Sequence, residues 1–587
     1  MPTNPNPLRP LRNSAPLRLP WVALLRLNRP ALVISLIPLA LLPCCWLWWW
    51  AGGLNPTVQP GRSAALLLVL GSLAAAWAIV RTSLTPRGAL PLLLALAWQA
   101  LALSTWDQVP EPGLIWFCER AAGLACAVGL AIWLNGREIT APVVATAIVG
   151  LGILILATVT MYRDLGSAWK LGSHAPFGNV NFNVGAAMPL VAIGIAMCLR
   201  SGRWWVLFAA GASAVVYLLG TTTLSEDRCN AVWLATGAAI ATALILRLPA
   251  RFHCPLLILG GATLVIGWIL VIAGVINLNS LGHGIAQRVY IGRAASEALV
   301  SPMVAVGYGP AAAIAVLPEQ ASFASSWLTV PSYLEHAHNE PLQVLLDGGL
   351  VLAGLLVWAL VWTIRPLWLR RHEALPAALL VAWCTAGAQC LIESHLSQPG
   401  SVLCLALLAG LSWSVAPFVT TPRKAGCLPI IPACGLTLLI VSELAFSGGG
   451  PTGIEARVWN RIGKQTDISA QLHELDRLRL RLGPLSELDY ERAKRLCQLK
   501  RFDEANAALA SHLNRLPVDV KALRLAETMR THHQATPKLA AAEIRARARA
   551  QDILNSMKAN ARNQSDLTQL KEYLNQRPAG DGPALAQ

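Results

Sequence analysis

Two histidines in one polar segment, His336 and His338, are the residues of this 587-residue chain best suited to chemistry. They lie in the run Tyr333-Leu334-Glu335-His336-Ala337-His338-Asn339-Glu340, directly before an apolar stretch. Histidine exists in both proton states near neutral pH, so it can serve as a general base. A structural histidine at an interface and a metal site using both rings are the other two interpretations. The spacing offers a metal ion two ligands and no clear third one.

A helix is expected to begin where the polar segment ends. Pro341 follows the segment, and proline is favoured at the first helical position. Asn339 or Glu340 can then satisfy the free backbone N–H groups at the start of this helix. His338 is therefore expected beside a helix N-terminus, where an anionic group is favoured.

The composition places these residues in a membrane protein. The chain is 55% hydrophobic and 13% charged, with a mean hydropathy of +0.50. A soluble domain carries about 25% charged residues, so this chain cannot cover a water-facing surface. A set of soluble domains is therefore excluded. The net charge of +16 is dispersed over loops without a basic patch interleaved with aromatic residues, so no nucleic-acid partner is expected.

The apolar stretches predict an all-α, polytopic membrane domain. A spanning helix needs roughly 20 mostly apolar residues. By this rule we predict about thirteen transmembrane helices. They lie near residues 31–51, 63–80, 88–105, 114–134, 141–161, 183–199, 203–220, 229–247, 255–277, 345–363, 375–393, 399–417 and 427–446.

The basic residues predict the orientation of these spans. With a cytoplasmic N-terminus, 17 Lys and Arg residues fall in inner loops and six fall in outer loops, as the positive-inside rule requires. We therefore expect a cytoplasmic segment at residues 1–30 and a membrane domain at residues 31–446, with a long outer loop at about 278–344. Arg228 lies in a short outer hairpin. It is either a functional cation or a solvated charge paired with Glu226 or Asp227.

Residues 447–587 form a polar tail that the topology places outside, in the periplasm of a Gram-negative cell. They contain 23 Lys and Arg and 16 Asp and Glu residues, which is a net charge of +7. The patterns at residues 485–496 and 501–509, followed by Pro517, resemble one tetratricopeptide-type repeat. One such unit cannot bury its own apolar face, so further helices or docking on the membrane domain are expected. A helical tail without a partner is the alternative.

The histidine segment resembles a signature of the O-antigen ligases. In both, a His-Asn pair (His338-Asn339) is followed after nine residues by Gly349 and after four more by Gly354. The same superfamily contains O-antigen polymerases and bacterial protein O-oligosaccharyltransferases. The resemblance extends over residues 170–420, approximately.

Other parts of the chain resemble the family in the same order. The run 288–293 and the stretch 301–309 are similar to its Arg-led helix and its Pro…Gly-x-Gly stretch. The run Gly178 to Asn181 is similar to its Gly-x-x-Asn run, and Arg228 falls where the family keeps an arginine. Two positions depart from the family. Asp227 stands where serine is common and can partly neutralise Arg228, and Gly292 replaces a typical tryptophan.

The resemblance implies glycan transfer from undecaprenyl diphosphate to an acceptor hydroxyl on the periplasmic face of the bacterial inner membrane. The transfer would invert the anomeric carbon and use neither metal nor cofactor. His338 would be the general base, and Arg228 and Arg288 would bind the donor diphosphate, for which the planar, permanently charged guanidinium is suited. The supporting residues would be Arg293, His336, Asn339 and Asn181.

The acceptor is either lipid A-core or a Ser/Thr hydroxyl of a protein. A soluble helical tail favours a protein acceptor, because a ligase that acts only on lipid needs no such module. An O-antigen or exopolysaccharide polymerase with the same donor chemistry is an open alternative. A transporter or flippase is disfavoured, because transporters place ionisable residues near the bilayer midplane and here they gather at the outer ends of spans.

Overall fold

The computed structural model describes most of the chain between residues 84 and 576. The described residues are 84–85, 89–105, 110–134, 138–164, 180–198, 203–221, 230–273, 275–276, 283–313, 316–317, 336–415, 419–420, 462, 465, 467–482, 486–516, 519–532, 534–556 and 564–576. The segment 1–30, the residue Arg228 and the predicted spans at 31–51, 63–80 and 427–446 lie outside them.

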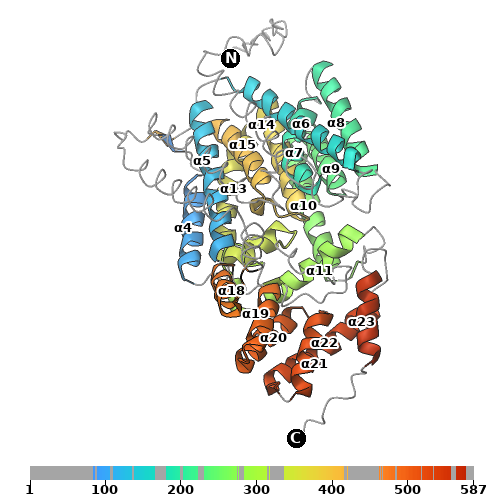
Figure 1. The fold of residues 1–587 in the computed structure, drawn as a ribbon. Helices are drawn as coiled ribbons and strands as arrows, with labels where there is room; N and C mark the ends of the chain where they lie inside the picture. Colours follow the sequence, from blue (N-terminus) through green and yellow to red (C-terminus); the bar gives the residue numbers. More distant parts are fainter. Residues whose placement is uncertain are drawn as a thin grey trace, which may run out of the picture.

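The described part of the chain is helical, which confirms the all-α part of the predicted fold class. The exception is one antiparallel pair of two-residue strands, β1 (Leu84–Thr85) and β2 (Val419–Thr420). The larger body in Figure 1 consists of apolar helices that lie at the positions of ten predicted spans. These are α4 (Ala89–Thr105), α5 (Pro110–Leu134), α6 (Thr140–Asp164), α7 (Val180–Cys198), α8 (Arg203–Thr221), α9 (Asn230–Ile245), α10 (Ala250–Ile272), α13 (Glu340–Leu369), α14 (Ala374–Cys390) and α15 (Pro399–Val415).

Three of the described helices contain a stretch that is long and apolar enough to cross a membrane. The stretches are Thr140–Val159 in α6, Ala250–Ile272 in α10 and Glu340–Leu369 in α13. The described part of the chain also contains shorter apolar helices. These features support the prediction of a membrane protein.

Helix α7 lies at the centre of the body and α10 lies at its edge. Helix α7 packs against α6, α14, α15 and α9, and its side chains from Asn183 to Ile193 are buried. The α10 residues Ile258, Leu259 and Ile266 are exposed although they are apolar. A helix that is apolar all round is suited to a lipid environment.

Several helix ends differ from the predicted spans by a few residues, and two of these differences shape the site. Helix α13 begins at Glu340 instead of residue 345, so the polar segment leads directly into it. Helix α14 ends at Cys390 instead of residue 393. The chain from residue 391 to residue 398 therefore forms a turn between α14 and α15, outside both helices.

Helix α13 contains a kink at Gly349, where φ is +64°. A Cβ atom at this position would lie 2.4 Å from the carbonyl oxygen of Ala305, so only glycine fits. The kink exposes backbone carbonyls of α13 to other segments. The Tyr308 N–H donates to Leu346 O at 2.6 Å, and Trp98 Nε1 donates to Gly348 O at 2.9 Å.

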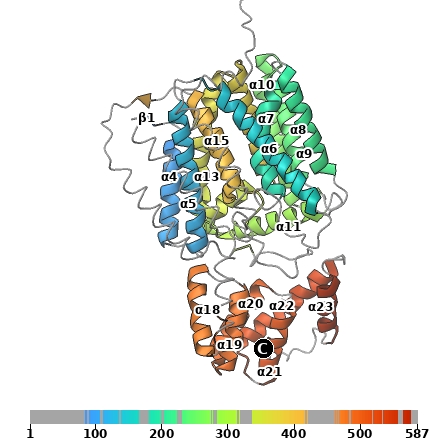
Figure 2. The same cartoon turned by 45° about the horizontal axis from the view of Figure 1, so that its top comes forward.

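The tail is a separate group of helices below the body in Figures 1 and 2. Its elements are α18 (Ile468–Leu482), α19 (Ser486–Gln498), α20 (Phe502–Arg515), α21 (Val520–Thr531), α22 (Pro537–Ser556) and α23 (Gln564–Gln576). Helices α19 and α20 pack closely together, and α18 contacts α5. The apolar core of the tail continues into Ile291 and Ala295 of α11 (His283–Ala298), so the tail contacts the body.

Candidate active site

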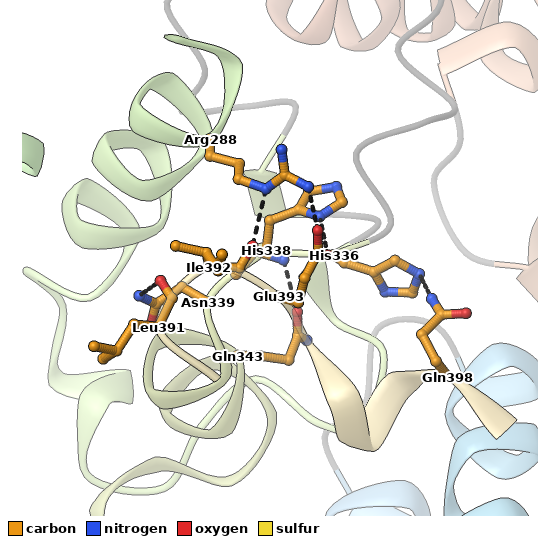
Figure 3. Close-up of polar contacts among 10 residues, drawn as sticks. Arg288, His336, His338, Asn339, Gln343, Leu391, Ile392, Glu393 and Gln398 are labelled. Carbon is orange, nitrogen blue, oxygen red and sulfur yellow. Dashed lines mark hydrogen bonds and ion pairs between the residues drawn. The ribbon is translucent and has the colours of Figure 1, made fainter. Parts of the chain in front are cut away.

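Two short segments of the body lie against each other and form the candidate site. One is residues 336–339, which precede α13, and the other is the turn 391–398. The Asn339 Nδ2 amide donates to Leu391 O at 2.8 Å, and the Leu396 N–H donates to Glu340 Oε2 at 3.0 Å. Figure 3 shows the two segments and the residues that connect them.

Glu393 in the turn joins two of the residues that the sequence predicted. Its Oε2 lies 3.1 Å from His338 Nδ1, and its Oε1 accepts a hydrogen bond from Arg288 Nη2 (Figure 3). Arg288 Nε also donates to Ile392 O at 2.9 Å. The Glu393 side chain is 5% exposed, while those of Arg288 and His338 are 15% and 19% exposed. A ligand can therefore reach the arginine and the histidine.

The contact with Glu393 orients the His338 ring. A carboxylate only accepts hydrogen bonds, so we assign the ring proton to Nδ1, which leaves the Nε2 lone pair able to take a proton. Burial raises the pKa of Glu393, but the charges and hydrogen bonds of Arg288 and His338 outweigh this effect and hold that pKa below its ordinary value. Glu393 is thus an ionised acceptor at neutral pH. This is the arrangement of a general base held by a carboxylate.

His338 has a backbone conformation that is uncommon for a residue with a side chain. Its φ is +46°, in the left-handed region, where a non-glycine residue is strained. Hydrogen bonds hold the chain on both sides of it. The Ala337 N–H donates to Gln343 Oε1 at 2.8 Å, and Asn339 Oδ1 accepts from the Leu342 N–H at 2.9 Å. Asn339 is therefore the N-cap of α13, which is one of the two residues that the sequence offered for this role, and Pro341 takes the second helical position instead of the first.

His336 is a buried neighbour of the pair. Its ring stacks on Trp116 at a centroid distance of 5.2 Å, and its Nε2 lies 2.7 Å from Gln398 Nε2. The His336 and His338 rings meet edge to face at 6.2 Å. His336 therefore links α5 to both segments of the site.

A third histidine, His395, lies buried in the same turn as Glu393. Burial lowers the pKa of His395 to about 4, although the nearby Glu393 acts in the opposite direction. The ring is therefore neutral at neutral pH. Its Cε1 atom would be 2.8 Å from a Cβ atom at Gly185, so the glycine in α7 leaves room for the ring.

The structure brings together four of the seven residues predicted for the site, namely His338, Arg288, His336 and Asn339. Arg293 contacts the end of α10 instead, where its Nε donates to Ile272 O at 2.7 Å. Arg293 lies five positions after Arg288 in the helix. At about 100° per residue the two side chains therefore point about 140° apart around α11. The side chain of Asn181, in the first turn of α7, lies outside the described residues, as does Arg228.

Sequence reasoning missed Glu393 and also a pair formed by Arg120 and Asp347. Arg120 Nη2 lies 2.6 Å from Asp347 Oδ2, and the Asp347 side chain is fully buried. Glu393 and Asp347 were both counted inside predicted spans. The available signal was their charge, because ionisable residues in apolar spans are costly and commonly functional.

Comparisons with known proteins assign the chain to no family. No protein-family model and no curated protein matches the chain. In the described part of the chain, no group of three or more His, Cys, Asp or Glu side chains is placed to hold a metal ion. The function is therefore inferred from the His338–Glu393–Arg288 cluster and from the sequence.

Proposed function

We propose that this protein is a membrane glycosyltransferase that moves an oligo- or polysaccharide from undecaprenyl diphosphate to an acceptor hydroxyl. The observation that carries the proposal is the cluster of His338, Glu393 and Arg288. It pairs an oriented base with a permanent cation at a site that a ligand can reach. These are the two groups that the transfer needs, because a hydroxyl is a poor nucleophile and a diphosphate leaves with negative charge.

In the proposed reaction His338 Nε2 takes the proton of the acceptor hydroxyl. The hydroxyl oxygen forms a bond to the anomeric carbon while the bond from that carbon to the phosphate oxygen breaks. The electron pair of that bond leaves with the diphosphate, and the attack from the opposite side inverts the anomeric carbon. Glu393 stabilises the imidazolium that forms on His338.

Arg288 is proposed to bind the diphosphate while it remains bonded to Glu393. Arginine has five N–H donors in a planar fork, so one guanidinium can hold a carboxylate and a phosphate together. Arg228 is proposed as the second cation. With Arg228 the site would compensate more of the charge that develops on the leaving diphosphate.

The proposed location of the site is the periplasmic face of a bacterial inner membrane. We infer about thirteen spans within residues 31–446, a cytoplasmic N-terminal segment 1–30 and a periplasmic tail 447–587. The excess of basic residues in the predicted inner loops supports this topology. The packing of consecutive helices α19 and α20 supports a tetratricopeptide-like tail, and this tail favours a protein Ser/Thr acceptor over lipid A-core.

The proposal is tested by reconstituting the full-length protein with an undecaprenyl-diphosphate-linked glycan. We expect His338→Ala to lower the transfer rate by about 10²–10⁴-fold, the usual contribution of a general base. Exposed His372, between α13 and α14, provides the control variant His372→Ala. Normal transfer by a folded, inserted His338→Ala protein would overturn the proposal.

Mass spectrometry of cells with and without the gene identifies the acceptor. Glycan on Ser/Thr peptides indicates a protein ligase, and glycan on lipid A-core indicates a lipid ligase. A change in glycan chain length alone indicates a polymerase, which is expected to use the same donor chemistry.

A further inference from the structure

A second polar network, centred on Arg120 of α5, lies beside the His338–Glu393 pair. Arg120 Nη2 donates to Asp347 Oδ2 at 2.6 Å, and Arg120 Nε donates to Leu396 O at 3.1 Å. The Arg120 side chain is only 9% exposed. One guanidinium thus contacts both α13 and the turn 391–398.

The first branch of the network leads to the backbone of His338. Asp347 Oδ1 accepts a hydrogen bond from Gln343 Nε2 at 2.8 Å. The other amide atom of Gln343, Oε1, accepts from the Ala337 N–H at 2.8 Å. Ala337 directly precedes His338, whose φ is positive. The branch therefore ends at the His336–Ala337 peptide, one residue before the peptide bond that leads into His338.

The second branch leads to the turn that carries Glu393. Leu396, whose carbonyl accepts from Arg120, lies three residues after Glu393, and its N–H donates to Glu340 Oε2. Arg120 also lies 5.5 Å from the centre of the Trp116 ring, which stacks on His336. The branch therefore fixes the turn relative to α5 and to the start of α13.

We propose that Arg120 is a positioning residue that keeps His338 and Glu393 at hydrogen-bonding distance. Stability alone does not explain a buried ion pair, because apolar residues of similar volume are often at least as stable. The position of Arg120 between α13 and the turn 391–398 does explain the ion pair, because the proposed reaction requires these two segments to keep a fixed relative position. The inference rests on the proposed function, since it assigns Arg120 a role in the transfer reaction.

The test compares Arg120→Met with the double variant Arg120→Met/Asp347→Leu and with Arg371→Met. Arg371 is a matched control, because it lies 4.5 Å over the Trp368 ring and donates to His253 Nδ1 near the other end of α13. Misplacement by about 1 Å can cost about 10²-fold in rate, so we expect Arg120→Met to lower kcat by about that factor with an unchanged donor KM.

The double variant separates positioning from stability. It removes the unpaired carboxylate along with the arginine, so its thermal stability should recover while kcat stays low. Methylguanidinium should restore part of the kcat of Arg120→Ala, and neutral methylurea should not. A kcat that recovers together with stability in the double variant would overturn the proposal, as would a folded Arg120→Met protein with normal kcat.

A readout without glycan transfer keeps this inference separate from the proposed function. Diethyl pyrocarbonate modifies accessible imidazole nitrogens, and peptide mass spectrometry resolves His338 from the other histidines. We expect Arg120→Met and Glu393→Gln to change the modification rate of His338 by at least about threefold, because both alter the contact between His338 Nδ1 and Glu393, whereas Arg371→Met should not. If the wild type transfers no glycan but this pattern holds, the proposed function fails and the positioning role stands. An unchanged His338 rate in Arg120→Met rejects the positioning role.

Discussion

His338 and Glu393 lie 3.1 Å apart between Nδ1 and Oε2, although 55 residues of chain separate them. The same carboxylate is bonded to Arg288. The carboxylate of Glu393 therefore contacts both the proposed base, His338, and the arginine that is proposed to bind phosphate, Arg288. Protonation of His338 and anion binding by Arg288 each change the electrostatic interaction with the same carboxylate. We therefore expect the two events to be coupled.

The first prediction concerns the charge of Glu393. Glu393→Gln preserves the size of the side chain and removes the charge that stabilises the His338 imidazolium. We expect kcat to fall by about 10²-fold, with partial recovery in Glu393→Asp. Steady-state transfer assays at several pH values measure this effect. A Glu393→Gln protein with an unchanged kcat and pH profile would show that the carboxylate has no role in orienting the base.

The second prediction concerns stability at acid pH. The pKa of Glu393 in the folded protein lies below its ordinary value of 4.5. Its ionised form therefore stabilises the fold at pH values above about 4.5, and this contribution is lost as the pH falls through the lower, folded pKa. We expect the difference in Tm between wild type and Glu393→Gln to shrink as the pH falls below about 4.5. A difference that grows toward acid pH would contradict the sign of this effect.

The third prediction separates the two glycines of the signature. A Cβ atom at Gly349 would lie 2.4 Å from Ala305 O, and the residue there has a positive φ. A Cβ atom at Gly354 would have no neighbour within 4 Å. Gly349→Ala should therefore lower the free energy of unfolding by about 1–3 kcal/mol or more, from backbone strain and the clash. Gly354→Ala should be neutral, or stabilising by up to about 1 kcal/mol. Thermal unfolding in detergent measures both, and equal losses would argue against the kink.

The fourth prediction concerns the two bonds of Asn339. Asn339→Ser retains an acceptor for the Leu342 N–H and loses the donor to Leu391 O, whereas Asn339→Ala loses both. The loss of an N-cap costs about 1 kcal/mol, so the alanine variant should have the lower Tm. If the serine variant is no more stable than the alanine variant, the cap contributes little to stability.

The positions of the ten apolar helices of the body could be predicted because an apolar stretch of sufficient length has few alternatives to a buried or lipid-facing helix. The tail helices α19 and α20 also lie where their patterns predicted them. A helix start near Pro341 was predictable, and α13 begins one residue earlier, because capping and proline preferences act over neighbouring residues. These are local effects that can be read from the sequence itself.

The partners across the site could not be predicted in this way. Glu393 meets Arg288 from 105 residues away, and Arg120 meets Asp347 from 227 residues away. Hydropathy counts placed both carboxylates inside spans without indicating which way they face. Arg288 and Arg293 both lie in the run 288–293 that resembles the Arg-led helix of the family, but the rotation of α11 directs them to different neighbours.

The bond from Arg293 to the end of α10 connects α11 to a long apolar helix. Helix α10 has 23 residues, which is about 35 Å at 1.5 Å per residue, against roughly 30 Å of hydrocarbon in a typical bilayer. A helix of this length adjusts to bilayer thickness by tilting. Its C-terminal carbonyl at Ile272 is bonded to the helix that carries Arg288. A change in the tilt of α10 would therefore act on α11 and, through α11, on the position of Arg288.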